Sequence, residues 1–347
     1  MILRAGCMLQ AGVKLGSGLI LFTGVMFPPL SARAAERLER SASYFGTTVN
    51  IVICYPEGGR EKALAAAGRV WGELALIHSR MNRFDPASDL SRLNQSAGDT
   101  ISVDPRIYGL IADSRKYGSL AGGAFDVTVT PLLDLWGAAA RRGVLPAREE
   151  ILEARQNVGV GRVELLEGLK ARVPQGMMVD LGGVAAGFAV DEAVRILRGA
   201  GFNDFLVDAG GEIYASGRSC DLGRWRIGIR DPRERSRVVH VLELEDMAVS
   251  TSGGYEKYFE INGERWPHII NPLTGYPGRG AVSATVIAPR ALDADALSTA
   301  LCVLGEGPGF RIIDGLGTGY AAMVMTENVL GKLEQKATQG YAVFRVK

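Results

Sequence analysis

The sequence predicts an α+β fold, and two observations support this class. Helical patterns of apolar residues gather in the first half of the chain and again near its end, beside runs of short β-rich segments. Many of those segments are joined by glycine-containing turns. Once an N-terminal leader is removed, roughly 310 residues remain, more than a single core usually holds. We therefore expect one large lobe or two intertwined lobes.

Helices are expected where apolar residues recur every three or four positions. In residues 61–81, apolar side chains from Leu64 to Leu74 share one helix face. Asp104 can cap a further helix, since Pro105 is tolerated in a first turn. The predicted helices span residues 61–81, 105–120, 189–197 and 292–304, with another starting near Pro308 and a short capped one within 81–94.

Strands are expected where β-branched and aromatic residues cluster between turn residues. The segment at 44–55 is the first of these, and the others follow the third predicted helix. The predicted strands span residues 44–55, 205–214, 225–230, 238–244, 282–288, 320–325 and 341–346.

The N-terminus has the three parts of a secretory signal. Arg4 and Lys14 precede an apolar run at 15–30, which ends in small residues around Ala34. A membrane anchor is the alternative, but glycines and prolines break the run, which is short for a span of ~20 apolar residues. We expect residues 1–34 to be cleaved after Ala34. Residues 35–347 would then form a periplasmic domain with no stable membrane insertion.

The charge of the chain limits the kinds of partner it can bind, and its cysteines limit the disulfides and metal sites it can form. Loss of the leader removes three basic residues and no acidic one, which takes the formal charge from +1 to −2. No basic stripe appears, which argues against nucleic acid or anionic lipid as the main partner. Cys54, Cys220 and Cys302 remain, with no pair at metal-ligand spacing. The odd count leaves at least one free thiol, and we expect all three to be buried small hydrophobic residues.

The helix at 292–304 carries a candidate metal site. Asp295 and Thr299 are four positions apart, so a carboxylate and a hydroxyl point from one face and can share a hard cation. Magnesium suits such ligands, with phosphates and waters completing its shell. The alternative is a first turn whose acids suit the helix dipole and whose threonine bonds its own backbone.

Two glycine-rich segments could admit a ligand. Residues 179–189 run through glycines into a helix, where exposed backbone N–H groups attract phosphate. The spacing does not match the dinucleotide-binding G-x-G-x-x-G pattern, and a tight structural turn is the alternative. Residues 207–212 place two glycines beside a strand, as a bulge or as a contact between backbone and substrate.

His268 is the candidate general base. It opens the segment 268–277, which ends in a Pro-x-Thr-Gly turn rich in polar groups. A structural role is the commoner one for a single histidine. Aromatic residues at 81–94 and 123–137 could stack a flat heterocycle, although core packing also accounts for them.

Taken in order, these segments resemble the ApbE family, the FAD:protein FMN transferases. The resemblance covers nearly the whole chain after the leader. Its motifs are Phe45-Gly46-Thr47, residues 81–94, Gly-Ala-Phe-Asp at 123–126, Asp-Leu-Gly-Gly at 180–183, Ala-Gly-Gly-Glu at 209–212, His-Ile-Ile-Asn-Pro at 268–272 and Ala-Asp-Ala-Leu-Ser-Thr at 294–299.

The resemblance implies an α+β fold of mixed or antiparallel sheets with packed helices, in which FAD lies in a cleft between two intertwined lobes with Mg2+ at its pyrophosphate. Family members transfer FMN from FAD to a Thr or Ser hydroxyl of a partner flavoprotein and release AMP. The acceptor would carry a motif similar to Asp-Gly-x-Ser/Thr-Gly-Ala-Ser/Thr. Residues 314–320 of this chain break that motif, so self-modification is not expected.

The resemblance also assigns roles to individual positions. His268 and Asp295 would be catalytic, His268 by deprotonating the incoming hydroxyl. Asp295 and Thr299 would bind the metal together with a backbone oxygen at or near Gly183. The positions implied to contact FAD are Phe45, Phe84, Ala124, Phe125, Asp126, Asp180, Ala186 and Ile269.

Ala186 is a departure from the family pattern, which often has lysine there. Arg83 or Arg279 could supply the missing charge. Asn271 also stands where many members carry Asp, a smaller change because either residue can accept a hydrogen bond in a turn. Two other functions stay open: an Mg2+-dependent FAD diphosphatase that uses water, and a periplasmic flavin-binding protein without turnover.

Overall fold

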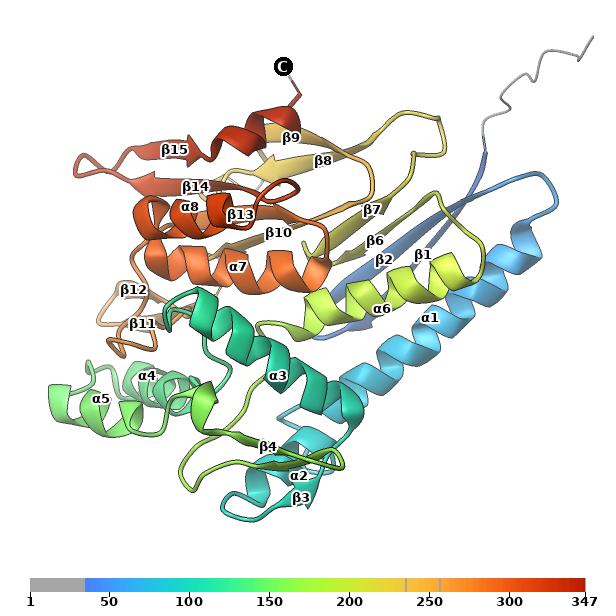
Figure 1. The fold of residues 1–347 in the computed structure, drawn as a ribbon. Helices are drawn as coiled ribbons and strands as arrows, with labels where there is room; N and C mark the ends of the chain where they lie inside the picture. The colour runs from blue at the N-terminus through green and yellow to red at the C-terminus, as the bar shows by residue number, and fades with distance from the viewer. Residues whose placement is uncertain (1–34, 235, 256, 347) are drawn as a thin grey trace, which may run out of the picture. The chain divides into compact units, whose positions relative to one another are not determined.

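An eight-stranded antiparallel sheet forms the centre of the computed structural model, which describes residues 35–234, 236–255 and 257–346 (Figure 1). The predicted secretory signal at 1–34 lies outside the described residues. The sheet has the order β1-β2-β6-β7-β10-β13-β14-β15. Its strands are β1 (Glu36–Tyr44), β2 (Thr47–Tyr55), β6 (Phe205–Ala209), β7 (Ile213–Ser216), β10 (Met247–Gly253), β13 (Ser283–Ala288), β14 (Ala321–Glu327) and β15 (Leu333–Ala337).

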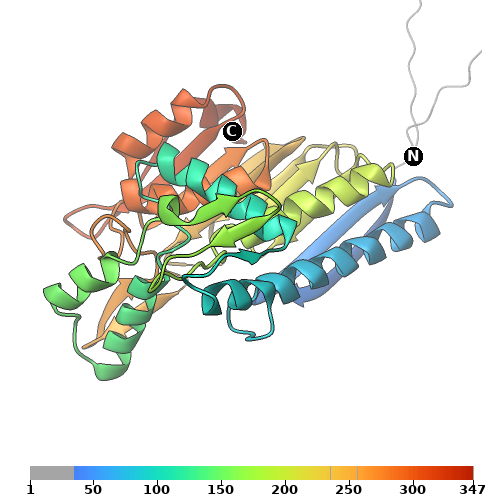
Figure 2. The same cartoon turned by 60° about the horizontal axis from the view of Figure 1, so that its bottom comes forward.

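One face of this sheet is covered by long helices (Figures 1 and 2). Their apolar faces and the sheet form the main core. α1 and α6 lie over the first strands, and α7 lies over β10 and β13. The helices of this layer are α1 (Arg60–Met81), α6 (Ala185–Gly199), α7 (Ala291–Leu304) and α8 (Glu306–Gly315), with α3 (Pro105–Leu120) against α7.

The other face is covered by a hairpin of β8 (Trp225–Arg230) and β9 (Val238–Leu244) and by the 3-10 helix η2 (Gln339–Val343). Side chains in β8 alternate between buried and exposed, as expected for a strand with one covered face. The side chains between this hairpin, η2 and the sheet form a second core. All six residues of β13 are buried, because α7 covers one side of that strand and the second core covers the other.

A smaller layer extends from the sheet beside the main core. It is built around Trp136, whose indole N–H donates to the Gly275 carbonyl at 2.9 Å. Its elements are α4 (Thr130–Arg142), α5 (Arg148–Arg155), β11 (Tyr258–Ile261) and β12 (Glu264–Pro267). The remaining elements are α2 (Asp89–Gln95), β3 (Ile101–Ser102), η1 (Val160–Arg162), β4 (Glu164–Leu166) and β5 (Lys170–Arg172).

Most predicted elements are confirmed, including the α+β class and the antiparallel sheet. The strand predicted at 205–214 is in fact two strands, β6 and β7, because Gly210 and Gly211 make a turn at positive φ. The strand predicted at 341–346 is wrong: the segment begins in η2, where buried Tyr341 packs against the sheet. Strand β1 and helices α4 and α5 lie in segments for which no element was predicted.

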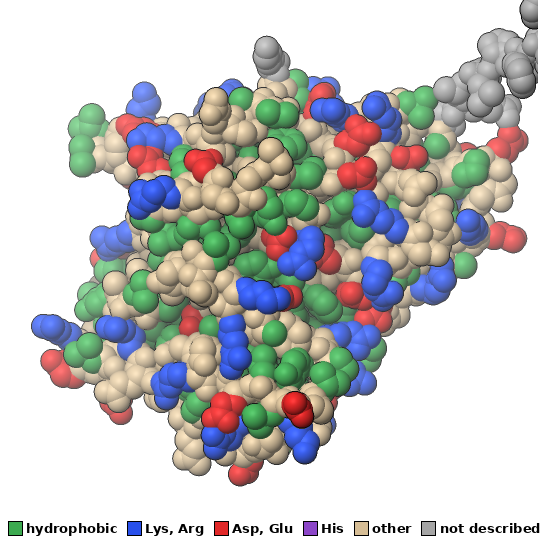
Figure 3. Space-filling view, in the orientation of Figure 1, with side chains coloured by type: hydrophobic (Ala, Val, Ile, Leu, Met, Phe, Trp, Pro, Cys, Tyr) green, Lys and Arg blue, Asp and Glu red, His purple; other side chains and the backbone are tan. Residues whose placement is uncertain are grey.

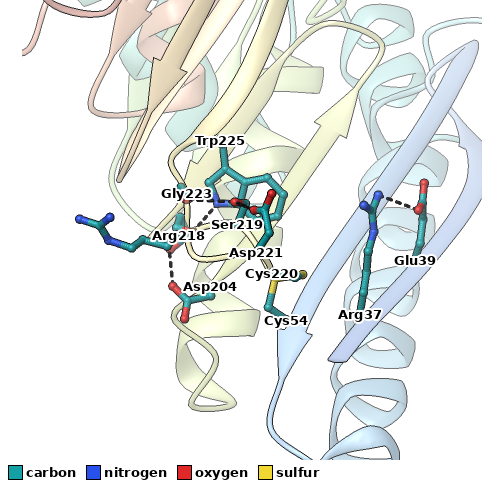
Figure 4. The surroundings of a disulfide bond; sticks show 11 residues. Arg37, Glu39, Cys54, Asp204, Arg218, Ser219, Cys220, Asp221, Gly223 and Trp225 are labelled. Atoms are coloured by element: carbon teal, nitrogen blue, oxygen red, sulfur yellow. Dashed lines mark hydrogen bonds and ion pairs between the residues drawn. A yellow bond between two sulfur atoms is a disulfide. The ribbon is translucent and has the colours of Figure 1, made fainter. Parts of the chain in front are cut away.

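The cysteine prediction needs correction. Cys54 in β2 and Cys220 in the segment before β8 form a disulfide, with Cα atoms 5.2 Å apart (Figure 4). Cys302 is a buried free thiol, as expected, and burial raises its pKa to about 12. The pairing was not predicted because 166 positions separate the two cysteines and only the folded sheet brings them together.

The visible surface mixes charges of both signs, and no face of one sign is seen there (Figure 3). This agrees with the near-neutral sequence. Among the residues that the structure describes, no helix has the length and apolar character needed to cross a membrane.

Candidate functional site

A cavity of about 510 Å³ brings the predicted motifs together. Every site residue predicted from the sequence lines this cavity except Ala186, which lies in the first turn of α6. The lining residues that were predicted are Phe45, Phe84, Ala124, Phe125, Asp126, Asp180, Gly183, His268, Ile269, Asp295 and Thr299. Segments separated by up to 254 positions in the sequence therefore meet at one site.

Asp295 and Thr299 share the pocket-facing side of α7, as their spacing predicted. Asp295 is buried, with 5% of its surface exposed, and its Oδ2 atom accepts the Gly187 N–H at 3.0 Å. Burial raises the pKa of Asp295 well above its ordinary value, and the nearby charge of Glu212 raises it further. A cation bound at this carboxylate would offset both costs.

A chain of hydroxyl groups fixes the orientation of Thr299. Ser298 Oγ donates to the Asp295 carbonyl at 3.0 Å, so in its 2.8 Å contact with Ser252 the Ser252 hydroxyl must donate. Thr299 must then donate in its 3.2 Å contact with Ser252. This directionality leaves the lone pairs of Thr299 Oγ1 available to a cation.

These residues fit a hard cation, although acidic side chains alone would not hold one. Among the described residues, no group of three or more His, Cys, Asp or Glu could hold a metal ion. Asp295 and Thr299 offer a carboxylate and a hydroxyl, and Gly183 lies on the same cavity wall. Oxygen ligands of this kind suit Mg2+, which usually keeps several positions for waters or substrate phosphates.

Aromatic residues form another part of the wall. Phe45 occupies a two-residue turn between β1 and β2 at φ 54°, a strained value for a bulky residue, and its N–H donates to His78 Nδ1 at 3.3 Å. Phe84 is 78% exposed, and the Arg83 guanidinium lies 4.2 Å from its ring centroid. Phe125 is buried against Tyr117. These rings can pack against a flat ligand.

Two acidic residues of the wall also hold loops in place. Asp180 accepts the Gly182 N–H at 2.8 Å and pairs with Arg83 Nε at 2.7 Å. Asp126 accepts backbone N–H groups of Thr128 at 2.7 Å and Val160 at 2.8 Å. The Arg83 charge is therefore already balanced by a carboxylate.

His268 is half-buried at the cavity, with its Nδ1 atom 2.8 Å from the Lys257 carbonyl. A carbonyl can only accept, so Nδ1 carries the proton and, in the neutral ring, Nε2 carries the lone pair. His78 and His240 do not line the cavity.

Several cavity residues were missed or left undecided by the sequence. Glu212, Ser252 and Lys257 line the wall, and Arg83 does so as one of two cations suggested to replace the missing lysine. The other suggestion, Arg279, lies over the Trp266 ring at 5.1 Å and is not among the lining residues. Glu212 could have been identified as a site residue from the sequence, because it ends the Ala-Gly-Gly-Glu motif.

The comparisons agree with this geometry. A FAD:protein FMN transferase of Vibrio cholerae is 34% identical over 304 residues, covering 85% of this chain and 90% of that protein. One of Haemophilus influenzae is 31% identical and covers 91% of this chain and 94% of that protein. The crystal structure of the ApbE protein from Thermotoga maritima superposes with a TM-score of 0.79 at 32% identity, over 90% of this chain and 100% of that chain. The flavin transferase ApbE from Vibrio cholerae gives a TM-score of 0.77 at 30% identity, over 89% and 99%. The ApbE family profile matches residues 45–324, and the chain belongs to the ApbE family.

Proposed function

We propose that this protein is an Mg2+-dependent FAD:protein FMN transferase, which moves FMN from FAD to a Ser or Thr hydroxyl of a partner flavoprotein and releases AMP. The observation that carries the proposal is the convergence of Asp295, Thr299 and His268 on one cavity lined by aromatic residues. The names of the relatives in Vibrio cholerae and Haemophilus influenzae support the same activity.

The proposed reaction is a displacement at the FMN phosphorus. The acceptor oxygen forms a new P–O bond, the P–O bond to AMP breaks, and the hydroxyl proton leaves with a base. His268 suits that role, because its proton is held at Nδ1 and Nε2 can accept another. Asp295, Thr299 and Gly183 would hold Mg2+, which neutralises charge on the pyrophosphate.

The charge of the cavity wall supports the need for a cation. The wall carries four carboxylates, at Asp126, Asp180, Glu212 and Asp295, against the cations of Arg83 and Lys257. An anionic pyrophosphate would meet repulsion in such a site unless a divalent ion accompanied it.

We further propose that the protein acts in the periplasm. The predicted signal at 1–34 motivates this location, and the disulfide between Cys54 and Cys220 supports it, because disulfides persist in oxidising compartments. The acceptor would be a flavoprotein there, with a motif similar to Asp-Gly-x-Ser/Thr-Gly-Ala-Ser/Thr.

The test incubates the purified protein with FAD, Mg2+ and a domain that bears the acceptor motif. We expect AMP release together with flavin fluorescence on the acceptor in a denaturing gel. AMP with only free FMN would instead assign an FAD diphosphatase, and FAD binding without either product would assign a flavin-binding protein.

A variant of Asp295 in α7, compared with a control in α3, tests the proposed metal ligand. Asp295→Ala should abolish Mg2+-dependent transfer, whereas Ser114→Ala should not, because Ser114 is a buried hydroxyl in α3 outside the cavity. Circular dichroism and thermal unfolding would establish that both variants are folded. Full activity of Asp295→Ala would refute the metal assignment.

A further inference from the structure

Helices α6 and α7 lack caps of their own. A helix leaves its first backbone N–H groups without partners, and a side chain just before the helix usually accepts one of them. Val184 precedes α6 and Arg290 precedes α7, and neither side chain makes such a hydrogen bond. Both helix starts therefore need acceptors from elsewhere in the fold.

Each helix supplies the acceptor for the other. Asp191 of α6 accepts the N–H groups of Ala291 at 2.8 Å and Leu292 at 3.1 Å, the first two residues of α7. Asp295 of α7 accepts the N–H of Gly187, the third residue of α6, at 3.0 Å. The two carboxylates thus form reciprocal caps that join the helices at their N-terminal turns.

Gly187 permits this close approach. A Cβ atom at that position would lie 2.7 Å from the Ala291 carbonyl oxygen and 2.8 Å from Asp295 Cβ. Backbone of one helix therefore contacts backbone of the other without an intervening side chain. A shift along this contact would change the position of the Asp295 carboxylate directly.

This contact bears on the metal site because the proposed ligands come from both sides of it. Gly183 lies in the turn that leads into α6, whereas Asp295 and Thr299 lie on α7. The register between the helices therefore sets the separation between the backbone ligand and the two side-chain ligands.

We propose that Asp191 is a positioning residue for metal binding, which holds α7 in register with α6 and so orients Asp295. The inference rests on the proposed function for its metal. Asp191 is not among the residues that line the cavity, and it acts through α7.

The test compares Asp191→Ala and Asp191→Asn with Asp104→Ala. Asp104 caps α3 by accepting the Arg106 N–H at 2.8 Å, so its loss matches the removal of a helix cap away from the α6–α7 contact. Mn2+ affinity is measured by electron paramagnetic resonance without FAD, and the Mg2+ concentration for half-maximal turnover is measured with FAD. Hydrogen exchange at residues 185–190 reports the Gly187 contact.

Asp191→Ala should weaken Mn2+ binding and raise the half-maximal Mg2+ concentration by about three- to tenfold, with faster exchange at residues 185–190. Asp191→Asn keeps an acceptor oxygen and should recover most of the affinity. Asp104→Ala should lower thermal stability and leave Mn2+ affinity unchanged.

Unchanged Mn2+ affinity in Asp191→Ala, or an equal loss in Asp104→Ala, would overturn the inference. Failure of the proposed function has a different signature: the unaltered protein would then release AMP without placing FMN on the acceptor, or form neither product, whatever the Mn2+ affinity of Asp191→Ala.

Discussion

Replacing Gly187 by alanine tests the close contact between α6 and α7. The added Cβ atom would meet the Ala291 carbonyl oxygen at 2.7 Å and Asp295 Cβ at 2.8 Å. Neither neighbour is the end of a flexible side chain, so the helices themselves must move. To reach an ordinary contact distance near 3.4 Å, the two helices must move apart by about 0.7 Å at this point.

The magnitude follows from two opposing effects. Overpacking of a close contact costs about 1–3 kcal/mol, whereas alanine in place of glycine in a helix favours folding by roughly 0.5–1 kcal/mol. We therefore expect Gly187→Ala to lower the free energy of unfolding by up to about 2.5 kcal/mol. The same movement would stretch the hydrogen bond between Gly187 N and Asp295 Oδ2 from 3.0 Å to beyond hydrogen-bond range.

Urea unfolding measures the stability change, and the Mg2+ dependence of turnover measures the effect on the site. Gly72→Ala is the matched control, because Gly72 lies within α1 and its added Cβ would meet nothing within 4 Å. That control should be stabilised by about 0.5–1 kcal/mol with unchanged Mg2+ dependence. If Gly187→Ala were stabilised as much as Gly72→Ala, the described packing of the two helices would be refuted.

Three further predictions concern the disulfide, a buried histidine and the hydroxyl chain. Reduction of the Cys54–Cys220 disulfide, or Cys54→Ser with Cys220→Ser, should lower the free energy of unfolding by about 2–5 kcal/mol, measured by urea unfolding with and without reductant. Burial and then the charge of Arg345 lower the pKa of His240, so the unfolded chain binds its proton more readily. Stability from His240 is therefore full above pH 6.5 and is lost as the pH falls through the lowered pKa, and His240→Gln should flatten this part of the pH dependence of unfolding. Ser298→Ala breaks the chain of hydroxyl groups that orients Thr299. It should weaken Mn2+ binding by about fivefold, measured by electron paramagnetic resonance titration.

Each of these predictions has a contradicting result. Equal urea midpoints with and without reductant would contradict the role of the disulfide. A pH profile of His240→Gln parallel to that of the unaltered protein would exclude His240 as its source. Mn2+ affinity in Ser298→Ala that matches the Ser114→Ala control would exclude the hydroxyl chain.

The sequence predicts features that depend on neighbours along the chain. The spacing of Asp295 and Thr299 places both on one helix face whatever the rest of the fold does, and the structure has them there. Asp104 with Pro105 likewise predicts the start of α3. In both cases, all the residues on which the prediction depends lie within one or two helical turns of each other.

Features that depend on distant segments could not be predicted from the residues alone. The partners Cys54 and Cys220 are 166 positions apart, and Asp191 caps a helix that begins 100 positions later. In the sequence, Asp191 is one acid in a helical pattern. The convergence of the cavity residues was predicted only through the family resemblance, which carries three-dimensional information that spacing does not.

The segment at 341–346 shows how a local signal can mislead. Its alternating apolar residues suit a strand, but Tyr341 is buried in the second core, where its hydroxyl lies 3.2 Å from His240 Nδ1. Packing of a single large side chain over the sheet outweighs a weak local preference, as tertiary context often does for strand propensity.

The alanine at position 186 changes how the cavity can meet a pyrophosphate. Arg83 is held by Asp180, so its charge is balanced before any ligand arrives. Of the two cationic side chains on the wall, only Lys257 has no ion pair with another described residue. If FAD and Mg2+ bind as proposed, the charge of the phosphates would be met chiefly by the ion at Asp295 and by Lys257, because the first turn of α6 carries no lysine. On the proposed function, the positioning of Asp295 by the paired helices would then contribute more to binding in this chain than it would where a lysine shared that charge.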